Sequence, residues 1–197
     1  LAAYSIEGRS SKDFEKTLNF LLSNQEDVHN LLTKYTDACF LYLRRQVQSG
    51  ADVIQIFDSW ANLLTKEGLI EYSFNYINAL ISALKLDPVT KNIPVIVFAR
   101  NPKCNIEELI NTSADCISLF WSMNDLNFEV AKNKVAIQGN LDPKILLESD
   151  ETIKRETYKI LERFKEYPGY IFNLGHGITP DISPDKIKYL TNIVREY

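Results

Sequence analysis

The sequence predicts a parallel α/β fold, and two observations carry that prediction. Five short apolar segments suited to buried strands recur along the chain, and each is followed by a stretch with helical spacing of apolar residues. The 197 residues are 45% hydrophobic and 24% charged, as in ordinary globular domains. Since no linker, charge block or repeat divides the sequence, we predict a single domain over residues 1–197.

Two helices are predicted before the first strand. Apolar residues at helical spacing predict a helix over residues 13–23, with Ser11 as its N-cap. A longer apolar stripe predicts a second helix over about 28–49. Gly50 follows this stripe and is the expected stop, because glycine readily adopts the left-handed conformation that ends helices.

The rest of the chain alternates between strands and helices. The predicted strands are 53–57, 94–98, 116–119, 135–138 and 170–174. The predicted helices that follow them are 67–84, 105–112, 124–132, 150–166 and 184–196. This order fits either an open doubly wound sheet or a (β/α)8 barrel, although a closed barrel needs roughly 250 residues. The turns after the strands match neither GxGxxG nor the P-loop pattern, which disfavours nucleotide binding.

Charge and composition exclude several classes of protein. The formal net charge of -4 disfavours binding to nucleic acid or to an anionic membrane through bulk electrostatics. No apolar run reaches the roughly 18 residues that a membrane span needs, and residues 1–9 are too polar for a secretory signal. Cys39, Cys104 and Cys116 lack CxxC spacing, so we expect reduced thiols in a cytoplasmic protein and no zinc site.

Polar residues follow the predicted strands, at the end where ligands bind in either fold. His176 lies between Gly175 and Gly177, and its imidazole could bind a carboxylate or transfer a proton, or be incidental in a glycine-rich turn. Ser59 lacks the GxSxG pattern of a nucleophile, so we predict a hydroxyl donor to a substrate carboxylate. Asp58 could be a general base or the cap of the following helix.

Three other polar residues are interpreted as a helix cap or as surface residues rather than as parts of a site. Asp142 precedes Pro143 and a helix, which favours an N-cap. His29 stands at the start of the long helix, where we expect a solvated surface residue. Arg100 follows the second predicted strand; it could lie near the cleft mouth, but a surface position is favoured.

Five segments of the sequence resemble the uroporphyrinogen decarboxylase family. They are Tyr4-Ser-Ile-Glu-Gly8, Ser11-Lys-Asp-Phe14, Gly50-Ala-Asp-Val-Ile-Gln-Ile-Phe-Asp-Ser-Trp-Ala61, Gln138-Gly-Asn-Leu-Asp-Pro143 and Phe172-Asn-Leu-Gly-His-Gly177. They occur in the family's order, and the resemblance covers this whole chain but only the C-terminal part of a typical member. The chain starts at Leu1 and its single methionine is Met123, so we expect a processed product, an engineered fragment or an incomplete chain.

The resemblance implies a (β/α)8 barrel that is incomplete at its N-terminus, with about five βα units in this chain. It implies a cytoplasmic, homodimeric lyase of haem biosynthesis that uses no metal or organic cofactor. Such an enzyme removes CO2 from the four acetate side chains of the tetrapyrrole uroporphyrinogen III and gives coproporphyrinogen III. Protonation of a pyrrole carbon makes the substrate its own electron sink.

The motifs that match the family also imply roles for four residues. Tyr4 would hydrogen-bond the substrate near the reacting acetate, and Ser59 would hold a substrate carboxylate. His176 would contact another carboxylate at the far side of the cleft, and Phe57 would form part of the apolar wall against the macrocycle. Tyr4 and His176 are the implied catalytic residues, and we expect Tyr4, Ser59 and His176 to converge on one cavity rim.

The chain departs from the family in ways that leave alternatives open. The family's Arg-Gln-Ala-Gly-Arg loop and the aspartate that binds the pyrrole NH groups have no counterpart, and Phe120-Trp121 stands where Asp-Trp is common. We therefore expect this fragment alone to be inactive, and its unpaired strand edges to favour aggregation, domain swapping or completion by another chain. One alternative is a corrinoid-dependent methyltransferase of the same superfamily, disfavoured because the HxC zinc signature is missing. Another is a truncated product without catalytic function.

Overall fold

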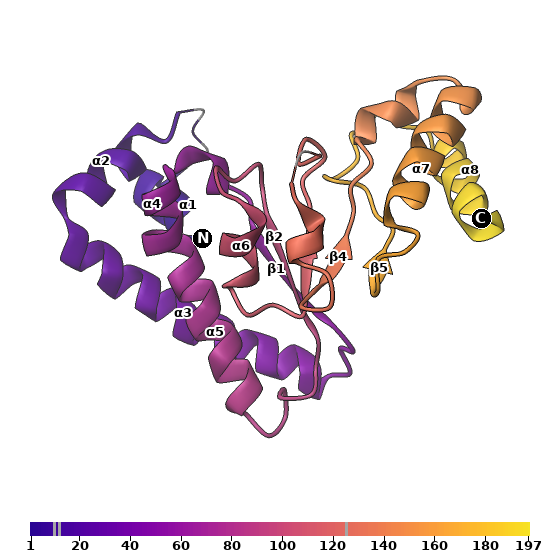
Figure 1. Cartoon of the computed structure of the whole chain (residues 1–197). Helices are drawn as coiled ribbons and strands as arrows, with labels where there is room; N and C mark the ends of the chain where they lie inside the picture. Colours follow the sequence, from indigo (N-terminus) through magenta and orange to yellow (C-terminus); the bar gives the residue numbers. More distant parts are fainter. Residues whose placement is uncertain (10, 12, 125) are drawn as a thin grey trace.

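The computed structural model describes residues 1–9, 11, 13–124 and 126–197. Its centre is one open sheet of five parallel strands in the order β1-β2-β3-β4-β5 (Figure 1). The strands are β1 (Ile54–Asp58), β2 (Val95–Ala99), β3 (Cys116–Ser118), β4 (Ala136–Gln138) and β5 (Tyr170–Ile171). The predicted parallel sheet is therefore confirmed. The described strands pair in chain order, without the reversal of a doubly wound sheet, so the arrangement is that of part of a (β/α)8 barrel.

The N-terminal segment forms three helices: α1 (Ala2–Glu7), α2 (Glu15–Ser23) and α3 (Gln25–Gln48). Apolar periodicity predicted the last two but not α1, which is only six residues long. The buried Glu7 carboxylate connects α1 to α2, because it accepts hydrogen bonds from the Thr17 backbone N–H (2.9 Å) and hydroxyl (3.1 Å). Gly50 has a φ of 101°, which explains the end of α3 close to the predicted stop. Lys12, within the motif that starts at Ser11, lies outside the described residues.

The predicted helix over residues 67–84 is confirmed, with one irregular turn. It consists of α4 (Lys66–Leu69), the π-helical turn η2 (Ile70–Phe74) and α5 (Asn75–Leu86). Four apolar side chains of α5 are buried in the main core: Ile77, Leu80, Ile81 and Leu84. Helix α5 also packs along α3, which covers the same side of the sheet (Figure 1).

The predicted helix over 124–132 is wrong. Only the short 3-10 turn η3 (Phe128–Val130) forms there, and Asp125 lies outside the described residues. Asparagine side chains account for the difference, because they bond the backbone in place of helical partners. The Asn124 amide donates to the Trp121 carbonyl (3.1 Å), and the Asn127 side chain accepts from the Glu129 N–H (3.2 Å).

The remaining helices fall close to their predicted positions. They are α6 (Ile106–Ile110), α7 (Asp150–Phe164) and α8 (Pro184–Glu196), with the 3-10 turns η1 (Ala61–Leu63) and η4 (Pro143–Leu147). Strand β5 is shorter than the predicted 170–174. Beyond Ile171, the chain pairs with the segment after β4 only through the isolated bridge between Leu141 and Leu174. In the described part of the chain, no helix is both long and apolar enough to cross a membrane.

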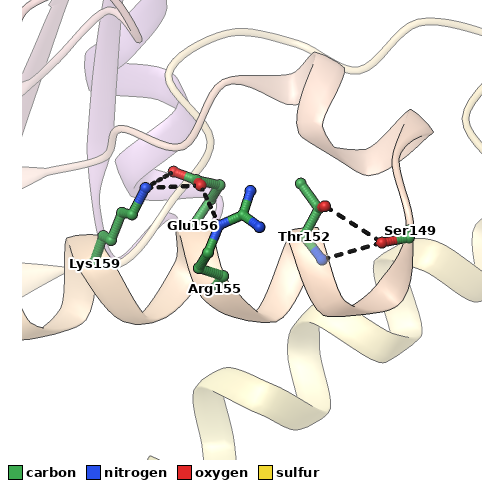
Figure 2. A network of polar contacts seen from close by, with 5 residues as sticks. All are labelled: Ser149, Thr152, Arg155, Glu156 and Lys159. Carbon is green, nitrogen blue, oxygen red and sulfur yellow. Dashed lines mark hydrogen bonds and ion pairs between the residues drawn. The ribbon is translucent and has the colours of Figure 1, made fainter.

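Helix α7 shows why its prediction succeeded. Figure 2 shows the Ser149 hydroxyl capping the helix, where it accepts from the Thr152 N–H (3.3 Å). One turn later, the Glu156 carboxylate accepts from Lys159 Nζ (2.8 Å) and Arg155 Nε (2.9 Å). These two hydrogen bonds hold the pKa of Glu156 below its usual value. A cap and local ion pairs are signals that sequence alone carries.

Two hydrophobic clusters hold the elements together. The larger cluster fills the space between the sheet and its covering helices, from β1 to Phe164 of α7. The smaller one joins η4, α7 and α8 at the orange and yellow end of Figure 1. Its buried members are Leu141, Leu146, Ile153, Ile182, Leu190 and Ile193. The two clusters therefore hold the strands in place, so that the ends of the strands extend from a packed core.

Candidate functional site

A cavity of about 370 Å³ lies at the carboxyl ends of the strands, and we call it the strand-end cavity. It is lined by Gln55, Phe57, Ser59, Phe98, Ser118, Asn173, Leu174, His176, Gly177 and Ile178. This is the end of the sheet at which α/β folds bind ligands. The cavity therefore brings together Phe57, Ser59 and His176, three of the four residues that the sequence singled out.

The strand register sets the floor of the cavity. Phe57 is paired with Phe98, which is followed across the sheet by Ser118 and Gln138. The Phe57 and Phe98 ring centroids are 5.8 Å apart, and Phe57 is 63% exposed, so an apolar surface is available. Gln138 Nε2 donates to the buried Ser118 hydroxyl (3.0 Å). Sequence reasoning missed this pair; its only signal was a polar residue within each of two apolar strands.

His176 stands above this floor on the segment after β5. Its ring makes edge-to-face contacts with Phe120 (5.8 Å between centroids) and Phe98 (6.3 Å). The residue is exposed, and no described residue forms a hydrogen bond with its imidazole. Both ring nitrogens are therefore open to a ligand, while two aromatic rings limit where the imidazole lies.

Ser59 and Asp58 follow β1 and have different environments. The Asp58 carboxylate accepts from the Trp60 N–H (3.2 Å) and the Ser73 hydroxyl (2.5 Å). One oxygen therefore holds the turn after β1 and the other binds η2, so both are used structurally, which favours the capping alternative over a general base. Ser59 is exposed, and its hydroxyl has no hydrogen-bond partner among the residues that the structure describes. This hydroxyl is free to donate to a ligand.

Tyr4 is not one of the residues that line the strand-end cavity. Its ring packs edge-on against Trp60, with 5.9 Å between centroids, and 47% of the residue is exposed. Trp60 follows Ser59, so Tyr4 lies beside the β1 end of the cavity. On the same indole ring, the half-buried Arg100 guanidinium lies 5.7 Å from the centroid. The convergence of Tyr4 with Ser59 and His176 on one ligand stays a prediction.

Two other polar residues have clear structural roles. Asp142 caps η4 as expected, because its carboxylate accepts from the Lys144 N–H (3.0 Å). His29 is partly solvated, as expected, since 41% of its side chain is exposed, but it also has partners that the sequence did not predict. It is half-buried between α3 and the η2–α5 helix, with Nδ1 2.6 Å from the Tyr76 hydroxyl and Nε2 3.4 Å from Glu71. These partners are more than 40 residues away in sequence, which explains why local patterns missed them.

The three cysteines are free thiols, as expected. Burial raises the pKa of Cys104 and of Cys116 to about 12, so neither is a thiolate near neutral pH. Burial also raises the pKa of Cys39. Within the described ranges, no group of three or more His, Cys, Asp and Glu side chains is arranged to hold a metal ion.

Gly175 is required by packing rather than by a ligand. A Cβ built on this residue would lie 2.4 Å from the Trp121 backbone nitrogen, which cannot move aside like a flexible side chain. We expect Gly175→Ala to lower the free energy of unfolding by about 1–3 kcal/mol, measured by urea denaturation of the full-length protein. Gly177→Ala is the control, since no atom lies within 4 Å of its Cβ. Equal losses in the two variants would contradict this explanation.

Comparisons with known proteins agree on a family. Residues 1–197 match the family described as uroporphyrinogen decarboxylase (URO-D). The uroporphyrinogen decarboxylases of Ruthia magnifica subsp. Calyptogena magnifica and Aquifex aeolicus are 38% and 39% identical to the chain. These alignments cover 100% of this chain and 57% of each relative, so the chain spans little more than half of their length.

A solved structure with a similar fold is a methyltransferase from Methanosarcina mazei. It superposes with a TM-score of 0.75 over 92% of this chain and 53% of that chain, at 18% sequence identity. The similarity supports the partial-barrel architecture. At this identity it does not extend to activity.

Proposed function

We infer the activity of the full-length protein from one premise: the chain belongs to the uroporphyrinogen decarboxylase family, which matches residues 1–197. The full-length protein is proposed to be a carboxy-lyase that converts uroporphyrinogen III into coproporphyrinogen III by releasing CO2 from four acetate side chains. The observation that carries the proposal is this match over the whole chain. We also propose that the protein is a cytoplasmic homodimer, as the family resemblance implies.

The strand-end cavity supports a ligand with carboxylates around an apolar ring. The Ser59 hydroxyl and the His176 imidazole are unpartnered in the described structure and lie in a wall that also carries the amides of Gln55 and Asn173. Hydrogen-bond donors of this kind bind carboxylates through charge-assisted hydrogen bonds. The exposed Phe57 ring offers an apolar surface to the macrocycle. The cavity thus has the two kinds of contact that a tetrapyrrole with acidic side chains needs.

In the proposed mechanism, the substrate supplies the electron sink. Protonation of a pyrrole carbon gives a cationic ring, and the C–C bond to the carboxylate then breaks with its electron pair moving into that ring. CO2 leaves, protonation of the former CH2 carbon gives a methyl group, and the proton first added to the pyrrole carbon is released, which restores the neutral ring. Tyr4 is proposed to hydrogen-bond next to the reacting acetate, and His176 to hold a carboxylate at the far side. No step of this scheme calls for a metal or an organic cofactor.

The ring cation needs a compensating negative charge in the site. In the family this charge belongs to an aspartate, and an arginine-rich loop binds substrate carboxylates; neither has a counterpart in residues 1–197. Strand β1 also has a neighbour on one side only among the described strands. We therefore propose that the rest of the full-length protein supplies these charges and covers this edge.

Measuring CO2 release by the full-length protein and by residues 1–197 tests the proposed activity. We expect the full-length protein, incubated anaerobically with uroporphyrinogen III, to release four molecules of CO2 per substrate and to form coproporphyrinogen III. Residues 1–197 alone are expected to release none, because the cation-stabilising carboxylate is absent. They are also expected to aggregate, to swap domains or to be completed by another chain, because β1 has an unpaired edge among the described strands. Absence of CO2 release by the full-length protein would overturn the proposed activity, and turnover by the fragment would overturn the need for the missing residues. Tight stoichiometric zinc would favour the methyltransferase alternative.

A further inference from the structure

We propose that Asn140 is a positioning residue for His176. Its carboxamide fixes the loop of residues 119–124 between β3 and η3, and this loop holds both the backbone before His176 and the imidazole ring itself. The proposal rests on the proposed function, since it takes His176 to be the residue that binds a substrate carboxylate. It concerns a residue that does not line the strand-end cavity.

The surroundings of Asn140 fix the orientation of its side chain. The residue is 2% exposed, and its Nδ2 lies 3.1 Å from the Phe120 carbonyl, 3.4 Å from the Trp121 carbonyl and 3.2 Å from Asn124 Oδ1. All of these partners are oxygen atoms, so only the NH2 group can face them. A single buried amide thus ties together two backbone carbonyls and one side chain of the loop.

The other end of the carboxamide has no partner. Asn140 Oδ1 is buried, and no hydrogen-bond donor reaches it from the described residues. Burying an unpaired acceptor is unfavourable, so the three contacts of Nδ2 with the loop are made at the cost of an unpaired Oδ1. An asparagine at position 140 is accounted for if the position of this loop matters for the position of His176.

The loop contacts both His176 and the residue before it. The Phe120 ring meets the His176 ring edge-to-face, at 5.8 Å between centroids and 87° between planes. The Trp121 backbone packs so closely against Gly175 that a Cβ there would lie 2.4 Å from the Trp121 nitrogen. Because Asn140 bonds the carbonyls of both Phe120 and Trp121, its loss would free both contacts.

Helix α7 supports the far end of the same loop. Asn124 Oδ1 accepts from Arg163 Nη1 (3.1 Å) as well as from Asn140 Nδ2 (3.2 Å). Asn140, which follows β4, thus connects to the loop after β3, and that loop packs against the segment after β5. Groups that hold a ligand-binding side chain in place act on its affinity, because a free side chain loses more conformational entropy on binding.

A double-mutant cycle in the full-length protein tests whether Asn140 acts through His176. We expect Asn140→Ala to raise KM for uroporphyrinogen III about tenfold while kcat changes less than about twofold. In a His176→Ala background, the same substitution is expected to change KM by less than about twofold, because the positioned group is gone. A tenfold effect that persists without His176 would overturn the proposal.

Two further variants keep the test decisive. Asn140→Asp has nearly the same shape but places an acceptor against the loop oxygens, so it should raise KM like Asn140→Ala. Thr90→Val is the control for a lost buried hydrogen bond: Thr90 is 1% exposed and donates to the Leu84 carbonyl (2.6 Å), before the start of β2. Its KM should equal that of the unsubstituted protein. An equal KM increase in the control would show a general loss of stability instead.

A second measurement does not depend on activity. Ring currents from Phe98 and Phe120 displace the proton–carbon signals of the His176 imidazole in nuclear magnetic resonance spectra. We expect Asn140→Ala to move these signals toward those of a histidine without aromatic neighbours and to leave the signals of His29 unchanged. Unchanged His176 signals would overturn the positioning role. If the unsubstituted protein does not turn over uroporphyrinogen III, the proposed function fails, and these spectra still decide whether Asn140 positions His176.

Discussion

The double variant Ser59→Ala/His176→Ala of the full-length protein is expected to bind coproporphyrinogen III about 10²- to 10⁴-fold more weakly than the unsubstituted protein. Each substitution removes a hydrogen bond to a charged carboxylate, worth about 1.5–3 kcal/mol, and each 1.4 kcal/mol corresponds to about tenfold in affinity. Ser59 and His176 line the same cavity from different strand ends, and they share no hydrogen-bond partner in the described structure. Their effects should therefore add.

Anaerobic titration calorimetry of the double variant and of each single variant measures these losses. The matched control is His29→Ala/Ser82→Ala, which changes the same residue types outside the strand-end cavity. We expect its affinity to stay within about twofold of the unsubstituted protein. A double variant that loses less than about fivefold would contradict the assignment of Ser59 and His176 as carboxylate donors.

The largest effect on stability is expected from Phe164→Ala, which should lower the free energy of unfolding by about 3–5 kcal/mol. Phe164 is 2% exposed and stacks on Tyr170, with 4.6 Å between ring centroids and 10° between planes. The Phe164 ring also makes edge-to-face contacts with Phe128 (5.2 Å between ring centroids) and Tyr167 (6.0 Å). Truncation would leave a cavity where α7 packs on β5, and it would remove three aromatic contacts.

Urea denaturation of the full-length protein measures this loss, and Leu86→Ala is the control. Leu86 is 84% exposed at the end of α5, so its truncation should cost less than about 1 kcal/mol. Comparable losses in the two variants would show that the aromatic cluster does not hold α7 to the sheet. A Phe164→Ala loss of the expected size would support the packing of α7 on β5.

Strong local signals made most of the elements predictable. Helices α7 and α8 have apolar stripes and serine N-caps at Ser149 and Ser183, and both form close to their expected bounds. The segment 124–132 failed because apolar spacing there competes with asparagine side chains that bond the backbone. The short β5 could not be predicted, because its length depends on how many residues of a neighbouring strand lie beside it.

The site was predictable only in part, for a related reason. Ser59 and His176 follow predicted strands, and the rule that ligands bind at strand ends was enough to select them. The Ser118–Gln138 pair joins residues 20 positions apart through the register of β3 and β4, which no local pattern contains. Asn140 was visible within a motif, but its three oxygen partners come from another loop. The selection of Tyr4 depended wholly on the family resemblance.

A crystal structure of the full-length protein with coproporphyrinogen III bound tests the central claim most directly. We predict one product molecule in the strand-end cavity, with the Ser59 hydroxyl and a His176 ring nitrogen each about 2.6–3.2 Å from a carboxylate oxygen of that molecule. The macrocycle should lie against Phe57, and the Tyr4 hydroxyl should lie near a methyl group left by decarboxylation. A product bound elsewhere, or one that contacts neither Ser59 nor His176, would contradict the account.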